Sequence, residues 1–332
     1  MPLHGGRLNA AAERYGIPRA QWLDLSTGIN PNGWPVPPLP PEVFSRLPEE
    51  DDGLQQAAVD YYGSRDLLLV PGSQMAIQVL PELRHELFGP ARVGVLYPAY
   101  AEHAFRWQQA GHQVQPLAEA QIEAGLNELD VLVLLNPCNP SAVTFDRECL
   151  LRWHAELADR GGWLLVDEAF VDATPELSLI TDSMPEGLVV LRSLGKFFGL
   201  AGIRVGAVCA QYTVLEYLSR RMGPWAISHP ARVIARQALA DRCWQQCMRD
   251  GLVLQQSRLH TLLKECMGGP VHSTALFACL VTEKAELIEH ACARNGILIR
   301  RFEQPAALRF GLPGNEAEWQ RLEQVLSEIR YD

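Results

Sequence analysis

The sequence predicts an α/β fold of the doubly wound type, in which a large domain with a mixed sheet is followed by a small α+β domain. Two observations support this fold class. Between residues 65 and 210, short apolar runs alternate with longer amphipathic runs, and several of the short runs are apolar on both faces, as in strands that helices cover on both sides. After residue 211 the pattern changes to long helical stretches and then to a shorter mixture, which predicts a second domain.

The apolar runs predict the elements in order. In the large domain we expect strands at 67–70, 92–96, 113–116, 130–135, 163–166, 188–191 and 205–210. Helices are expected between them at 73–87, 99–110 and 145–160, and the last ends at a Gly-Gly pair that is typical of a helix C-terminus. Further helices are expected at 211–222, 230–239 and 243–267, and then strands at 276–281, 298–301 and 308–312 with helices at 283–295 and 315–329.

The first forty residues differ from the rest because prolines are dense between 35 and 41. Such connectors make poor strands and helices, so we expect an arm or lid. The expected division is therefore an N-terminal arm with part of the small domain at 1–45, a large domain at 46–242 and a small C-terminal domain at 243–332.

Composition excludes several classes of protein. No run reaches the roughly 18 to 20 apolar residues of a membrane span, and a net charge of −10 argues against nucleic acid and anionic lipid as partners. The eight cysteines are scattered and the N-terminus has no apolar leader, so we expect a cytoplasmic protein. No metal site is expected, since Cys243 and Cys247, the nearest to a ligand pair, fit better as core residues of a helix.

Polar, aromatic or Gly/Pro residues follow five of the expected strands. They occur at 71–74, 97–100, 136–140, 167–170 and 192–196. Ligands of open α/β sheets bind at the carboxyl ends of strands. The five segments therefore predict one shared pocket.

Lysine chemistry has few candidates, because the 29 cations are 26 arginines and only three lysines. Lys264 and Lys284 have acidic neighbours typical of a solvated surface. Lys196 lies instead among Gly, Phe and Leu, where a desolvated amine can act as a Schiff-base nucleophile or a general base. A plain surface lysine in a loop is the alternative at this position.

Three further strand-end residues fit a pyridoxal ring. Asp167 is placed to keep a pyridinium nitrogen protonated, although a helix cap or an ion pair explains it equally well. Asn139 is placed to hydrogen-bond the phenolic oxygen of the ring, or is an ordinary turn residue. Tyr100 is suited to stacking on the ring, or is a core aromatic.

A phosphate requires hydrogen-bond donors. Ser73 and Gln74 open a helix, where free backbone N–H groups and the helix dipole attract an anion, unless Ser73 is only a helix cap. Ser193 and Arg204 flank Lys196 and add a hydroxyl and a guanidinium to the same expected site.

Four ordered motifs carry a family resemblance: Asn-Pro-x-Asn-Pro at 136–140, Asp-Glu-Ala-Phe at 167–170, Ser-x-x-Lys at 193–196 and Ala-Gly-x-Arg-x-Gly at 201–206. They resemble those of fold-type I, aspartate aminotransferase-like enzymes that use pyridoxal 5'-phosphate, and the resemblance covers nearly the whole chain. It implies that Lys196 binds the cofactor covalently, that Asp167 pairs with its pyridine nitrogen and Asn139 with its phenolic oxygen, and that Tyr100 stacks on it. It also implies phosphate contacts from Ser73, Gln74, Ser193 and Arg204, a grip of Arg309 on the substrate α-carboxylate, and a homodimer.

Two features narrow the family. His-Gly-Gly at 4–6 followed by Leu-Ser-Thr-Gly-Ile-Asn-Pro at 25–31 resembles the start of the threonine-phosphate decarboxylases of cobalamin biosynthesis, and Phe170 replaces a tyrosine usual in histidinol-phosphate aminotransferases. The resemblance implies that L-threonine O-3-phosphate is decarboxylated to (R)-1-amino-2-propanol O-2-phosphate. It places Asn30 and His4 near the substrate carboxylate or phosphate, and Arg300 or Arg301 at the phosphate.

The sequence departs from its relatives at three places. Leu47 precedes Pro48 where many relatives have a tyrosine that reaches the partner subunit's cofactor, Gly195 replaces a Ser or Thr before the lysine, and the phosphate loop itself varies. Two other functions stay open. One is a histidinol-phosphate or related phosphorylated amino-acid aminotransferase, and the other is a binding or regulatory module that keeps the fold without turnover.

Overall fold

The computed structural model describes residues 5–330, and their contacts divide them into two compact units. The first unit contains the residues before 34, residues 140–143 and the chain from Cys247 onward, while the second contains residues 34–139 and 144–246. Among the described residues, no helix is long and apolar enough to cross a membrane.

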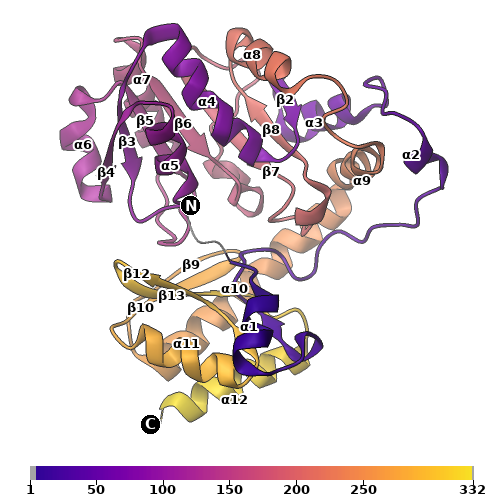
Figure 1. The fold of residues 1–332 in the computed structure, drawn as a ribbon, viewed down its shortest axis with the longest axis vertical. Helices are drawn as coiled ribbons and strands as arrows, with labels where there is room; N and C mark the ends of the chain where they lie inside the picture. The colour runs from indigo at the N-terminus through magenta and orange to yellow at the C-terminus, as the bar shows by residue number, and fades with distance from the viewer. Residues whose placement is uncertain (1–4, 331–332) are drawn as a thin grey trace. The chain divides into compact units, whose positions relative to one another are not determined.

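The second unit is built on a seven-stranded sheet in the order β2-β8-β7-β6-β5-β3-β4 (Figure 1). The strands are β2 (Leu67–Val70), β3 (Arg92–Leu96), β4 (Gln113–Leu117), β5 (Val131–Leu135), β6 (Trp163–Asp167), β7 (Leu188–Ser193) and β8 (Gly206–Cys209). All neighbouring pairs are parallel except the two that β8 makes. The sheet is therefore mixed, as expected.

The helices of this unit are α2 (Glu42–Ser45), α3 (Leu54–Tyr62), α4 (Ser73–Phe88), α5 (Glu102–Gln109), α6 (Ile122–Gly125), α7 (Arg147–Ala158), α8 (Tyr212–Met222) and α9 (His229–Ala240). Of these, α4, α5, α7 and α8 pack against the sheet. Residues of α4, α5 and α8 form one core with alternate residues of the strands, such as Val131 and Leu165. The intervening strand residues, such as Leu132 and Leu164, are equally buried, which explains why these runs are apolar on both faces.

The first unit contains a four-stranded antiparallel sheet in the order β12-β13-β10-β9. Its strands are β9 (Val271–Thr274), β10 (Phe277–Val281), β12 (Arg300–Glu303) and β13 (Ala306–Gly311), and a separate parallel pair joins β1 (Leu23–Asp24) to β11 (Ile297–Leu298). The helices are α1 (Leu8–Tyr15), α11 (Ala285–Arg294), α12 (Glu316–Arg330) and, from Cys247 onward, α10 (Arg242–Met267).

The N-terminal segment is more regular than we expected. α1 and β1 lie before the prolines, in the stretch expected to form an arm or lid and part of the small domain. Proline restricts only itself and the residue before it. The Ala-rich stretch at 8–15 therefore forms a helix regardless of the prolines at 35–41.

Candidate functional site

The register of the sheet places three of the expected site segments beside one another. Leu135, the last residue of β5, pairs with Asp167, the last residue of β6, and Asp167 pairs in turn with Leu191 of β7. Because these strands are parallel, their carboxyl ends share one edge of the sheet. Asp167 therefore lies at the same edge of the sheet as the segments that follow β5 and β7, which contain Asn139 and Lys196.

Gly206 brings the expected phosphate residues to this edge as well. As the first residue of the antiparallel strand β8, it pairs with Val70 on one side and with Ser193 on the other. The N-terminus of α4, which begins at Ser73, follows Val70 closely, and Arg204 lies two residues before Gly206.

Close backbone approaches form a cradle at this point. Gly72 has φ +77°, and a Cβ added there would lie 2.5 Å from Nη2 of Arg204. A Cβ on Gly206 would lie 2.7 Å from the backbone nitrogen of Ser73. Glycine at both positions keeps the first N–H groups of α4 and the Arg204 guanidinium open toward the same space, a donor set that fits a phosphate.

Asp167 is buried, and both of its carboxylate oxygens accept hydrogen bonds. Oδ1 accepts from the backbone N–H of Ala169 at 3.1 Å, and Oδ2 lies 3.0 Å from Nε2 of His103 in the first turn of α5. A carboxylate only accepts, so Nε2 of His103 carries the proton. Such a carboxylate is suited to hold a protonated pyridine nitrogen.

His103 is a candidate site residue that the sequence did not predict. It is fully buried and lies 64 positions from Asp167 in the chain. Its only sequence signal is a histidine one turn after Tyr100 in a helix that follows a strand end, which is too common a pattern to identify a partner.

Lys196 follows β7 in a turn and is half-buried. Its Nζ lies 5.3 Å from the centre of the Phe170 ring, a cation–π distance. The preceding Gly195 packs closely, since a Cβ there would lie 3.2 Å from Cα of Ala201. A residue with a Cβ at this position would therefore require its neighbours to shift by a few tenths of an ångström.

Tyr100 and Gln74 lie against one another. The Tyr100 hydroxyl donates to Oε1 of Gln74 at 3.1 Å, and burial, followed by the charge of Glu102, raises the pKa of Tyr100 to about 12. Tyr100 and Asn139 are both half-buried. The Gln74 side chain is thus engaged with Tyr100, and its backbone N–H is the group that the α4 terminus offers to an anion.

A buried charge cluster adjoins Asp167 and Ser193 in the chain. Arg192 pairs with Glu168 at 3.2 Å and with Asp172, and all three side chains are nearly inaccessible to solvent. The Tyr61 hydroxyl also donates to Asp172 at 2.9 Å. The cluster joins the residues next to Asp167 and Ser193, so it braces the ends of β6 and β7 against one another.

The first unit contains a second group of expected site residues. Arg300 of β12 pairs directly with Arg309 of β13, which places both side chains on the same face of the sheet. Arg309 is buried and donates to the carbonyl of Ser26. Burial, with the charge of Arg300, lowers its pKa to about 10, and burial, with the charge of Arg7, lowers the pKa of Arg300.

Arg301 is placed differently from Arg300. It points to the opposite face, as successive strand residues do, and its guanidinium lies 2.9 Å from Glu289, with Glu286 and Glu303 also within 4 Å. Asn30 is buried, and its Oδ1 accepts from the backbone N–H of Asn32 at 3.0 Å. His4 lies outside the described residues.

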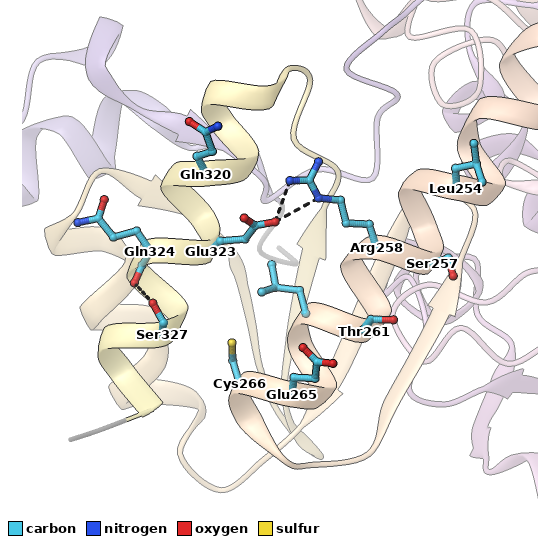
Figure 2. A pocket seen from close by; sticks show the side chains of 11 residues that line it. Leu254, Ser257, Arg258, Thr261, Glu265, Cys266, Gln320, Glu323, Gln324 and Ser327 are labelled. Atoms are coloured by element: carbon cyan, nitrogen blue, oxygen red, sulfur yellow. Dashed lines mark hydrogen bonds and ion pairs between the residues drawn. The ribbon is translucent and has the colours of Figure 1, made fainter.

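A groove of about 890 Å³ lies between α10 and α12 of the first unit. Figure 2 shows Arg258 paired there with Glu323. None of the residues expected at the site line this groove. The arrangement of strand ends described above is therefore the better candidate for the chemistry.

Comparison with known proteins gives the family. The family model for aminotransferase class I and II matches residues 47–326. A threonine-phosphate decarboxylase of Pseudomonas aeruginosa is 50% identical over 323 residues, which is 97% of this chain and 96% of that protein.

Two solved structures share the fold. The L-threonine-O-3-phosphate decarboxylase of Porphyromonas gingivalis has a TM-score of 0.77 at 20% identity, with 93% of this chain and 100% of that chain covered. The histidinol-phosphate aminotransferase of Sinorhizobium meliloti in complex with pyridoxal-5'-phosphate has a TM-score of 0.82 at 18% identity, with 100% and 95% covered. The chain therefore belongs to the aminotransferase class I and II family, in the branch of the threonine-phosphate decarboxylases.

Proposed function

We propose that this chain decarboxylates L-threonine O-3-phosphate to (R)-1-amino-2-propanol O-2-phosphate, as a step in cobalamin biosynthesis. The 50% identity to a threonine-phosphate decarboxylase along nearly the whole chain supports this reaction. The structural likeness to a histidinol-phosphate aminotransferase, at 18% identity, supports the fold that both enzyme classes share and does not favour transamination.

Pyridoxal 5'-phosphate is the cofactor of the family, and the cradle at Gly72 and Gly206 fits its phosphate. When bound, it supplies an electron sink that accepts the electron pair released by the leaving CO2. Lys196 would hold the cofactor covalently, and Asp167, oriented by His103, would keep the pyridine nitrogen protonated. After CO2 has left, the Lys196 amine is the group we assign to return a proton to Cα.

The remaining cofactor contacts follow the family motifs. Tyr100 would stack on the ring and Asn139 would bind its phenolic oxygen. Ser193, Arg204 and the backbone N–H groups of Ser73 and Gln74 would bind the phosphate.

The observation that carries the substrate assignment is the pairing of Arg300 with Arg309. Arg309 is buried, and burial, followed by the charge of the half-buried Arg300, lowers the pKa of Arg309. An anionic ligand would offset this repulsion between cations. L-Threonine O-3-phosphate carries a carboxylate and a phosphate. We assign the carboxylate to Arg309 and the phosphate to Arg300, because Arg301 is already neutralised by Glu289 and its neighbours. Asn30 and His4 remain proposed substrate residues.

The proposed enzyme is a cytoplasmic homodimer. Phe44 and Leu47 expose 68% and 62% of their area, and apolar side chains exposed together are typical of protein interfaces. A monomeric mass at micromolar concentration with full activity would contradict the dimer.

The substrate assignment is tested by comparing Arg300→Gln with Arg301→Gln. Loss of a charge-assisted contact to phosphate raises KM about 10- to 100-fold, and we expect this rise for L-threonine O-3-phosphate in Arg300→Gln. Arg301→Gln serves as the control and should stay within about threefold of the wild type, as expected for a surface ion pair. Equal effects of the two substitutions would refute the assignment.

A further inference from the structure

We propose that Glu102 is a positioning residue for the cofactor, which acts through Gln74 to hold the ring of Tyr100 in place. This inference rests on the proposed stacking role of Tyr100. It concerns three side chains of the second unit, from the first turn of α4, the segment before α5 and the first turn of α5.

The hydrogen bonds among these side chains run in one direction. The Tyr100 hydroxyl donates to Oε1 of Gln74 at 3.1 Å, and Nε2 of Gln74 donates to Oε2 of Glu102 at 3.0 Å. Because a carboxylate accepts and never donates, Glu102 requires the NH₂ side of the Gln74 amide to face it. The amide oxygen must then face Tyr100, and the phenol must be the donor.

Glu102 is a suitable anchor because it is held firmly. Its side chain is 6% exposed, and the same Oε2 also accepts from Nε of Arg106, one helical turn later, at 3.2 Å. A buried carboxylate is costly unless it is paired, and here the Arg106 guanidinium and the Gln74 amide both donate to Glu102. The Arg106 side chain is 30% exposed, so its guanidinium stays partly hydrated while it pairs with Glu102.

The consequence concerns the angle of the Tyr100 ring. A phenol with one fixed partner cannot swing about its side-chain bonds as freely as a phenol bonded only to water. Burial and the charge of Glu102 raise the pKa of Tyr100 to about 12, so the hydroxyl keeps its proton, and with it the bond to Gln74, throughout the neutral range. Glu102 thus fixes the orientation of the Gln74 amide, and the amide fixes the position of the Tyr100 hydroxyl. The hydroxyl in turn fixes the angle of the ring against which the cofactor would lie.

The test is a double-mutant cycle on the holoenzyme, with Glu102→Met and Tyr100→Phe as the single variants. Glu102→Met removes the acceptor and keeps the length of the side chain, and replacing a buried ionic group by an apolar one is often tolerated. Tyr100→Phe keeps the ring and removes the hydroxyl. The readouts are the dissociation constant of pyridoxal 5'-phosphate and the induced circular dichroism of its absorption band, neither of which needs a substrate.

We expect each single variant to weaken cofactor binding about tenfold, as expected for a bond to a charged group, and to reduce the induced circular dichroism. The double variant should be no worse than either single variant, because all three break the same chain of bonds. Glu102→Gln retains an acceptor oxygen for Gln74 and should restore binding to within about threefold of the wild type.

The matched control is Glu216→Met, which breaks an Arg–Glu pair of the same spacing on the exposed face of α8, where Glu216 and Arg220 lie 2.7 Å apart. It should leave both readouts unchanged. If Glu102→Met fails to fold, Glu102→Ala replaces it in the same cycle.

The proposal is overturned if Glu102→Met binds the cofactor as tightly as wild type with an unchanged dichroic band. It is also overturned if the fold-losses of cofactor affinity in the two single variants multiply in the double variant, because Glu102 and Tyr100 would then act separately. A protein that binds the cofactor but catalyses another reaction would still show the predicted cycle, so failure of the proposed decarboxylation leaves this test intact.

Discussion

Replacing His103 by Phe should impair the cofactor site while leaving the fold in place. The substitution keeps an aromatic ring of similar size in a fully buried position and removes the donor that lies 3.0 Å from Oδ2 of Asp167. Asp167 keeps the backbone N–H of Ala169 as its second donor. The Asp167 carboxylate therefore loses one of its two hydrogen bonds, and no side-chain donor then orients it.

The size of the effect follows from the burial of both partners. A hydrogen bond to a charged group contributes about 1.5–3 kcal/mol, and little solvent reaches His103 or Asp167 to screen it, since their side chains are 0% and 5% exposed. At about 1.4 kcal/mol per factor of ten, kcat/KM for L-threonine O-3-phosphate should fall about 10- to 100-fold. The dissociation constant of pyridoxal 5'-phosphate should rise in the same range.

The control is His154→Phe, which removes another buried histidine of the same unit. Nε2 of His154 lies 2.8 Å from the carbonyl of Glu186, away from the strand ends that carry the site. Both variants should lose some stability in urea, but only His103→Phe should lose cofactor affinity and activity. Equal activities in the two variants would show that the bond between His103 and Asp167 does no more than support the fold.

Three other outcomes follow from the same structure. In Lys196→Ala, borohydride reduction of the holoenzyme should no longer add the mass of the cofactor to the chain, and addition at another lysine would refute the assignment. Arg192→Met leaves Glu168 and Asp172 buried without their cation and should lower the free energy of unfolding by about 3–5 kcal/mol; a urea midpoint unchanged from the wild type would contradict this. Since the pKa of Arg309 is lowered to about 10, its charge is present below that pH and lost above it, so log(kcat/KM) should decline as pH rises through 10, and a flat profile to pH 11 would be inconsistent with carboxylate binding by Arg309.

Much of the sheet could be predicted because its strands carry a strong local signal. Runs such as 131–135 and 163–167 are apolar on both faces and end at Asn136 and Asp167, and the structure has strands there. β9 was missed because only the first of its four residues, Val271, is apolar. The helix at 54–62 was missed because it is only nine residues long, with glycine on both sides.

The site was predictable only in part, for a physical reason. Asp167 and Lys196 are marked by motifs of adjacent residues, whereas His103 and Glu102 act on partners 64 and 28 positions away. Such contacts depend on how α5 packs against the sheet, and no local pattern reports that. The choice between Arg300 and Arg301 likewise required the strand register, because the pairing with Arg309 decides which arginine shares its face.

Decarboxylation itself is tested most directly by following the fate of the carboxyl carbon. The purified holoenzyme is incubated with L-threonine O-3-phosphate labelled with ¹³C at C1, without any 2-oxo acid, and the products are followed by ¹³C NMR. The label should appear as CO2 and bicarbonate in an amount equal to the substrate consumed, over many turnovers. Retention of the label in a 2-oxo acid, with turnover only when 2-oxoglutarate is supplied, would contradict it and indicate an aminotransferase.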